Sequence, residues 1–175
     1  MSHLVLTLIG PDRPGIVEEV ADPVAAHGGN WVESRMARLG GQFAGILRVE
    51  VPEDRAAALV EALRLLERRG LRVAVEAEPR AATPAPRRLL SVDLVGLDRP
   101  GIVREISHVF AERGVNVEEL ITDLTPAAMS GELLFRSRAL VKVPPELDAT
   151  ELRARLEKLA SDLMVTVSVA EPDAR

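Results

Sequence analysis

The chain has 175 residues, 47% of them hydrophobic and 2% aromatic, which is typical of a folded protein with an aliphatic core. Its net charge of −5 and the scarcity of aromatic stacking side chains disfavour direct binding to nucleic acid. The absence of cysteine excludes disulfides and thiol catalysis, and the absence of a secretion signal or an apolar run of ~20 residues predicts a cytoplasmic protein without a membrane partner.

The first half of the chain predicts the element order strand, helix, strand, strand, helix, strand. Short branched apolar runs indicate the strands, and apolar residues at helical spacing indicate the helices. Pro14 suits a first helical turn, and Gly40 with Gly41 forms a tight turn between two strands. We expect strands at residues 4–9, 31–39, 43–51 and 71–75 and helices at 14–27 and 55–69.

The second half predicts the same order of elements. We expect strands at residues 89–95, 115–124, 133–143 and 164–169 and helices at 100–113 and 150–161. This order is the ferredoxin-like βαββαβ arrangement, an α+β fold in which the helices cover one face of an antiparallel sheet.

An internal duplication explains why the two halves read alike. Residues 6–30 align without gaps to 92–116, and the hexapeptide DRPGIV is present in both copies, at 12–17 and 98–103. A six-residue identity inside a longer gapless alignment indicates duplication rather than chance.

The stretch between the copies, residues 80–88, is rich in Pro, Ala and Arg and has no periodicity, which is typical of an extended linker. We therefore predict a first domain at 1–79 and a second domain at 89–175. Each is small for a lone domain, so we expect mutual packing or a homodimer.

A DRPGIV turn between the first strand and the first helix of a small βαββαβ unit resembles the ACT domain, a ligand-sensing module. The resemblance covers nearly the whole of both halves. The tandem organisation, together with TPAAMSGELLF at residues 125–135, resembles the glycine cleavage system transcriptional repressor family. That resemblance implies two ACT domains without a catalytic domain, a small amino acid ligand such as glycine or serine, no cofactor, and action on transcription through a DNA-binding activator protein.

The duplicated turn is the candidate ligand site. Its backbone N–H groups lie at a helix start, where the helix dipole favours an anion such as an amino acid carboxylate. Aspartate can accept a hydrogen bond from the ligand ammonium, glycine permits close approach, arginine can clamp the carboxylate, and asparagine offers both a donor and an acceptor. The resemblance implies that ACT ligands lie between two domains, beside this turn and the start of the second strand. The predicted ligand-binding residues are Asp12, Arg13, Pro14, Gly15, Ile16, Asn30, Asp98, Arg99, Pro100, Gly101, Ile102 and Asn116.

A purely structural interpretation stays open for the same residues. The aspartates are equally suited to capping the helix or holding the turn. The prolines and glycines are ordinary punctuation of a turn, and the arginines are suited to exposure to solvent.

The connection between the second and third strands is six residues longer in the second copy than in the first. An exposed loop of small residues with one methionine is suited to covering a ligand or contacting a partner. The alternative is an insertion tolerated at the end of a hairpin. We expect a lid or docking loop that includes Thr125, Met129, Ser130 and Gly131.

Two other functions stay open beside the amino-acid-sensing regulator. Similar ACT modules are fused to formyltetrahydrofolate deformylase and phosphoserine phosphatase domains, so a regulatory relative of those enzymes is one alternative, and a ligand-independent protein-interaction module is the other. We expect no enzyme activity, because the chain ends directly after the second unit and leaves no room for a catalytic domain. The three histidines lie at unrelated positions, and no nucleophile-elbow or nucleotide-binding motif occurs, so no catalytic or metal-binding residue is predicted.

Overall fold

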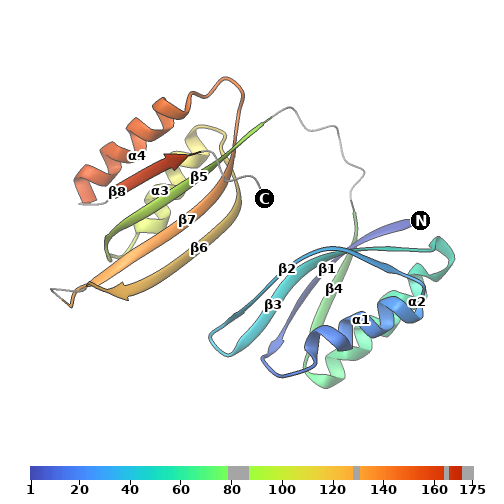
Figure 1. Ribbon diagram of the computed structural model, residues 1–175. Helices are drawn as coiled ribbons and strands as arrows, with labels where there is room; N and C mark the ends of the chain where they lie inside the picture. Colours follow the sequence, from blue (N-terminus) through green and yellow to red (C-terminus); the bar gives the residue numbers. More distant parts are fainter. Residues whose placement is uncertain (79–86, 128–130, 164–165, 171–175) are drawn as a thin grey trace. The chain divides into compact units, whose positions relative to one another are not determined.

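The computed structural model describes residues 1–78, 87–127, 131–163 and 166–170, and side chains as far as residue 158. The chain separates into two compact units, Met1–Ala82 and Thr83–Arg175, each with a sheet of its own (Figure 1). Residues 80–86 of the predicted linker lie outside the described part of the chain.

The first unit is a four-stranded antiparallel sheet with two helices on one face (Figure 1). Its elements are β1 (Ser2–Pro11), α1 (Ile16–Ala26), β2 (Asn30–Leu39), β3 (Gln42–Val51), α2 (Glu53–Arg64), the 3₁₀ helix η1 (Leu65–Arg69) and β4 (Arg72–Ala77). The strand order is β2-β3-β1-β4, and every neighbouring pair is antiparallel. Since β1 and β2 both run against β3, they share a direction and begin at the same end of the sheet.

The second unit repeats this architecture. Its elements are β5 (Arg88–Leu97), α3 (Ile102–Glu112), β6 (Asn116–Pro126), β7 (Leu133–Val143), α4 (Ala149–Leu163) and β8 (Thr166–Ala170). The strand order is β6-β7-β5-β8, again with antiparallel neighbours. The predicted α+β fold of two ferredoxin-like βαββαβ domains is therefore confirmed.

Aliphatic side chains fill a separate core in each unit. In β1 the alternate residues Leu4, Leu6 and Leu8 are buried, because successive strand side chains point to opposite faces and the helices cover only one of them. The helical residues of this core recur at helical spacing. They are Ile16, Val20 and Val24 of α1 and Leu59 and Leu63 of α2.

The first helix of each unit begins later than predicted. The residue before α1 is Gly15, whose φ of +89° is left-handed, and the residue before α3 is Gly101, whose φ is +92°. A left-handed residue cannot belong to a right-handed helix, so each helix starts at the isoleucine that follows. Pro14 and Pro100 consequently lie in the turn and not in the first helical turn.

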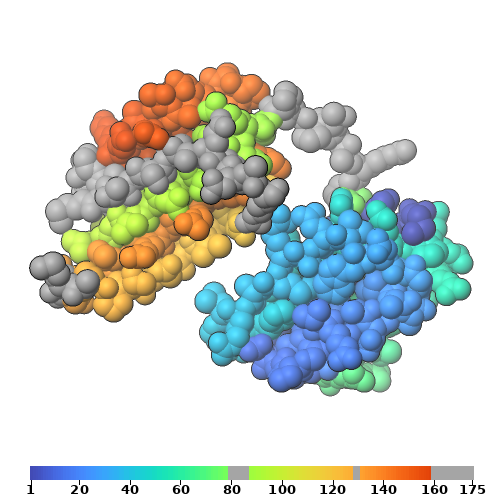
Figure 2. All heavy atoms as spheres, in the orientation of Figure 1, coloured from blue at the N-terminus to red at the C-terminus, as the bar shows by residue number. Residues whose placement is uncertain are grey.

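Among the described residues, no helix covers the other face of either sheet (Figure 1). In the first unit, Val5 and Ile46 lie on this open face, and Ile46 is 50% exposed. Figure 2 shows the open face of the second unit toward the viewer, with atoms of β6 and β7 along it. Within the described residues, no helix is long and apolar enough to cross a membrane.

Candidate functional site

The turn between β1 and α1 is held by backbone hydrogen bonds on both sides. The N–H of Asp12 donates to the carbonyl of Gly41 over 2.9 Å, which ties the turn to the β2–β3 hairpin. The N–H of Glu19 donates to the carbonyl of Gly15 over 2.9 Å and closes the first turn of α1. A Cβ at Gly15 would meet no atom within 4 Å, so the positive φ, and not a close neighbour within the chain, is what requires glycine there.

A bidentate ion pair spans this turn. The guanidinium of Arg13 donates to both carboxylate oxygens of Glu19, over 2.6 and 2.7 Å. The hydrogen bond from Arg13 holds the pKa of Glu19 below its usual range, and the same bond raises the pKa of Arg13. Arg13 is therefore paired within its own domain, and a ligand carboxylate would have to compete with Glu19 for it.

The second turn has the same construction. Arg99 donates to both carboxylate oxygens of Glu105, over 2.9 and 2.5 Å, and this hydrogen bond lowers the pKa of Glu105. The N–H of Asp98 donates to the carbonyl of Leu133 over 3.0 Å, which ties this turn to the β6–β7 hairpin. Neither glutamate was among the predicted site residues, although Glu19 and Glu105 occupy the same place in the two repeats.

The two aspartates of the turns have different surroundings. Nε of Arg38 donates to Oδ2 of Asp12 over 2.6 Å. Leu124 takes the place of Arg38 in the second unit, because it lies opposite Phe135 of β7 as Arg38 lies opposite a phenylalanine of β3. Within the described residues, no hydrogen bond or ion pair reaches the carboxylate of Asp98, so this is the carboxylate that is free to accept one.

Helix capping is not the role of either aspartate. The N-cap residues are Gly15 and Gly101, and neither helix start has a side-chain capping bond. The first backbone N–H groups of α1 and α3 therefore have no side-chain acceptor, and in α3 the N–H of Ile102 donates to the carbonyl of Arg99 over 3.4 Å.

Two of the predicted ligand-binding residues belong to the cores. Ile16 is 4% exposed and Ile102 is 3% exposed, and each packs with the buried side chains of its unit. These side chains pack in the cores because a side chain on the inner face of the first helical turn points at the sheet, and ligand contact at these residues stays a prediction. Pro14 and Pro100 are exposed in the turns.

Asn30 and Asn116 lie at the opposite end of the sheet from the turn of their own domain. Asn30 is level with Glu50 and His3, near the start of β1, whereas the turn follows the far end of that strand. A ten-residue strand spans roughly 30 Å, so a ligand within one domain cannot contact both places. In the second unit the side chain of Asn116 donates to Glu118 over 2.6 Å.

The longer connection of the second unit begins later than predicted. Thr125 belongs to β6, where it lies opposite Leu134. Gly131 has a left-handed φ of +72°, and its N–H donates to the carbonyl of Ala127 over 3.1 Å. The predicted lid residues Met129 and Ser130 lie outside the described residues.

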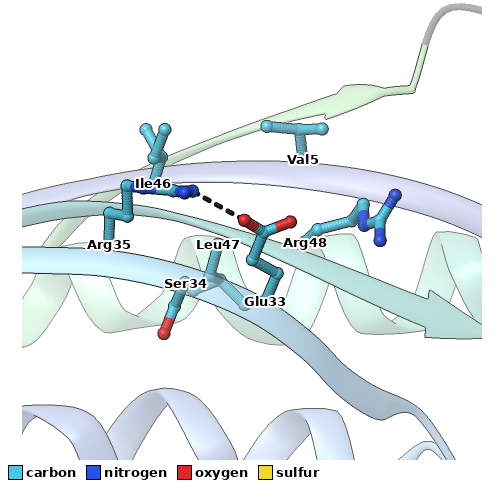
Figure 3. Close-up of a pocket in the computed structure, with 7 residues that line it drawn as sticks. All are labelled: Val5, Glu33, Ser34, Arg35, Ile46, Leu47 and Arg48. Atoms are coloured by element: carbon cyan, nitrogen blue, oxygen red, sulfur yellow. Dashed lines mark hydrogen bonds and ion pairs between the residues drawn. The ribbon is translucent and has the colours of Figure 1, made fainter. Parts of the chain in front are cut away.

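The open face of the first sheet contains a small pocket of about 170 Å³ that the sequence analysis did not find (Figure 3). Figure 3 shows the side chains of Val5, Ile46, Glu33 and Arg48 on one side of the sheet, with Glu33 bonded to Arg35 over 2.6 Å. Its lining comes from three strands, with one residue of β1 and three consecutive residues each of β2 and β3, and forms no sequence motif. The residues that line it are Val5, Glu33, Ser34, Arg35, Ile46, Leu47 and Arg48.

These sites offer hydrogen-bonding and charged groups, which are suited to binding a small polar ligand. Within the described residues, the helix starts present N–H groups without a side-chain cap and, in the second unit, the turn presents a carboxylate without a partner. Across the described residues, no three His, Asp or Glu side chains form a set that could hold a metal ion.

Some of the matches to known proteins cover a little under half of this chain, and others cover nearly all of it. A family model described as the ACT domain matches residues 2–76. The glycine cleavage system transcriptional repressor of Escherichia coli is 26% identical over 169 residues, which is 95% of this chain and 88% of that protein. A UPF0237 protein of Methanococcus maripaludis is 37% identical over 79 residues, or 45% of this chain and 81% of that protein. The crystal structure of an unknown protein from Galdieria sulphuraria has a TM-score of 0.82 at 29% identity and covers 98% of both chains.

Proposed function

Since the chain belongs to the ACT-domain family, as a tandem protein of the glycine cleavage system transcriptional repressor family, we propose that it is a cytoplasmic amino-acid-sensing regulator. Its ligand is a small amino acid, glycine or serine, and it acts through a protein partner, a transcription activator, without binding DNA itself. Catalysis has no part in this proposal. The ligand would favour one conformation of the protein over another and so change how it meets its partner.

One observation carries this proposal, the unpaired carboxylate of Asp98 beside the uncapped start of α3. An amino acid is a zwitterion, so it needs an acceptor for its ammonium group and donors for its carboxylate. Asp98 supplies the acceptor, and the first N–H groups of α3 supply donors in the field of the helix dipole. Arg104, in the first turn of α3, adds positive charge on the carboxylate side, where the first unit has Glu18.

The first turn is less suited to the same ligand. Asp12 already accepts a hydrogen bond from Arg38, and Glu18 adds negative charge to the first turn of α1. A ligand ammonium would have to displace Arg38, and its carboxylate would approach Glu18. We therefore assign the glycine or serine site to the second domain.

The test is isothermal titration of the full chain with glycine and then with serine. Asp98→Asn removes the negative charge with almost no change of shape, and Asp12→Asn is the matched control in the other copy. A charged hydrogen bond is worth about 1.5–3 kcal/mol, so we expect Asp98→Asn to weaken binding by about tenfold or more while Asp12→Asn leaves it unchanged. Absence of saturable heat with both amino acids, in a folded protein, would contradict the proposal.

A specific feature also supports a homodimer. Leu120, Ile121 and Leu124 of the edge strand β6 are 44%, 55% and 50% exposed, whereas the equivalent positions of β2 carry Ser34, Arg35 and Arg38. Exposed apolar side chains on both faces of an edge strand favour burial against another protein surface.

Sedimentation of the full chain at several concentrations tests this surface. We expect Leu120→Ser to shift the protein toward the monomer. Leu39→Ser is the control, because Leu39 is 83% exposed at the end of the β2–β3 hairpin. If Leu120→Ser leaves the dimer unchanged, the dimer contact does not involve this part of β6.

A further inference from the structure

The open face of the first sheet contains a buried hydrogen-bond donor without an acceptor. Nε of Arg48 has almost no contact with solvent and no hydrogen-bond partner in the described part of the chain. The same guanidinium reaches Glu78 only through Nη1, over a long 3.4 Å. Buried polar groups in folded proteins nearly always have a partner, so an unpaired donor beside a pocket indicates a missing acceptor.

The pocket around Arg48 combines charge with an apolar wall. The lining carries two arginines, Arg35 and Arg48, and one glutamate, Glu33. Since Glu78 outside the lining reaches Arg48 only over 3.4 Å, the lining favours an anion. Val5 and Ile46 form the apolar part of the lining (Figure 3). The volume of about 170 Å³ suits a small metabolite.

We propose that this pocket binds the carboxylate of a small aliphatic molecule. Arg48 donates to the carboxylate from Nε and the adjacent Nη, and the aliphatic tail packs on Val5 and Ile46. A branched-chain amino acid and a plain aliphatic acid share this chemistry, and Glu33 distinguishes them because it can accept a bond from an ammonium group. The site is separate from the turn at Asp98, and its ligand has a tail that glycine lacks, so the inference goes beyond the proposed function.

The second unit does not repeat these groups at the equivalent positions. There Arg138 replaces Ile46 and is bonded to Asp93 of the neighbouring strand over 2.8 Å. Leu140 replaces Arg48, opposite Ser91 where the first unit has Val5. The arginine that carries the proposal is thus present in one copy alone, and we expect one such site per chain.

The test is an NMR titration of the ¹⁵N-labelled full chain that follows arginine Nε–H signals. The signal of Arg48 is identified by its loss in Arg48→Gln. The probes are L-valine, 3-methylbutanoate, which lacks only the amino group, and 3-methyl-1-butanol, which lacks the carboxylate. We expect the Arg48 signal to shift saturably with a carboxylate probe and not with the alcohol. Arg48→Gln should weaken binding, followed at the amide of Ile46, by about tenfold or more.

Arg72→Gln is the matched control, because Arg72 lies on the same open face, on β4, outside the pocket lining. If L-valine and 3-methylbutanoate bind with equal affinity, the carboxylate and the aliphatic tail are sufficient for binding. If L-valine binds more tightly, the ligand is an amino acid whose ammonium group bonds to Glu33. No shift with either carboxylate, an equal shift with the alcohol, or equal weakening by Arg72→Gln would overturn the proposal.

The outcome is independent of the proposed function. Glycine binding that depends on Asp98, without any response of Arg48 to the carboxylates, would reject this pocket and keep the sensor site at the second turn. A response of Arg48 that persists in Asp98→Asn, without glycine binding, would reject the turn and keep the pocket.

Discussion

Arg13 and Glu19 form a two-bond ion pair across the turn that precedes α1, with the two side chains 36% and 19% exposed. The pair joins a residue of the turn to a residue in the first helical turn, and Arg99 with Glu105 repeats it in the second unit. Its first consequence is that these arginines hold the conformation of the turn rather than standing free for a ligand.

Replacing Glu19 by Gln should therefore lower the unfolding midpoint of the first domain and loosen the turn. The reason is that Arg13 loses its charged acceptor in a geometry that the turn supports. Hydrogen exchange at the amides of Asp12 and Glu19 measures the loosening directly. Glu61→Gln is the control, because Glu61 pairs with Arg64 on an exposed helix surface, and it should change little. Equal effects of the two variants would contradict a special role of the ion pair across the turn.

Acid should weaken both domains through the same glutamates. The pKa values of Glu19 and Glu105 are lowered in the folded protein, chiefly by the hydrogen bonds from their arginines. A lowered folded-state pKa contributes stability at pH values above the unfolded pKa of about 4.3, and this contribution is lost as the pH falls through the folded pKa. Urea midpoints measured from about pH 6 to about pH 3 should fall less steeply in the double variant Glu19→Gln/Glu105→Gln. Parallel curves for wild type and variant would show that other carboxylates dominate.

The bond from Arg38 to Asp12 distinguishes the first turn from the second. Replacing Arg38 should therefore change the number of glycine molecules that bind to each chain. Arg38→Leu places at the first turn the residue type that the second unit has at Leu124, and it frees the carboxylate of Asp12. We expect titration with glycine to rise from one site per chain toward two. Leu124→Arg should weaken the site at Asp98 by supplying a competing internal cation. A stoichiometry indifferent to both substitutions would mean that these aspartates do not contact the ligand.

The two cores should respond separately to loss of a buried leucine. Leu63 and Leu156 are both 0% exposed, the first in the core of the first unit and the second in that of the other. Leu63→Ala should destabilise the first domain by about 2–5 kcal/mol through lost burial and a residual cavity. Trp31, the one tryptophan of the chain, packs against the first core, so its fluorescence reports that domain.

The matched variant for this experiment is Leu156→Ala. It should leave the fluorescence transition of Trp31 in place and shift only the part of the far-ultraviolet circular dichroism transition that belongs to the second domain. A shift of the Trp31 signal by Leu156→Ala would show that the two domains unfold as one unit.

The sequence by itself determined the order of the elements and their duplication. Helix periodicity is local, because side chains recur every three to four residues, so Ile16 to Val24 already indicate which face of α1 is buried. The continuous apolar run of β1 indicates a strand but not which of its faces is buried. The repeated DRPGIV indicated that both halves share one fold. The glycine of that turn was likewise foreseeable as a turn residue, although its left-handed φ delays the helix to Ile16.

Tertiary structure alone decided which side chains meet. The bond from Arg38 to Asp12 joins residues that are distant in the sequence, and the pocket around Arg48 draws its lining from three strands. Asn30 was predicted to share a ligand site with the turn, and the shared direction of β1 and β2 puts it at the far end of the sheet from the turn of its own domain. The physical reason is that such contacts depend on strand pairing and register, which are set by long-range packing and not by the local spacing of residues.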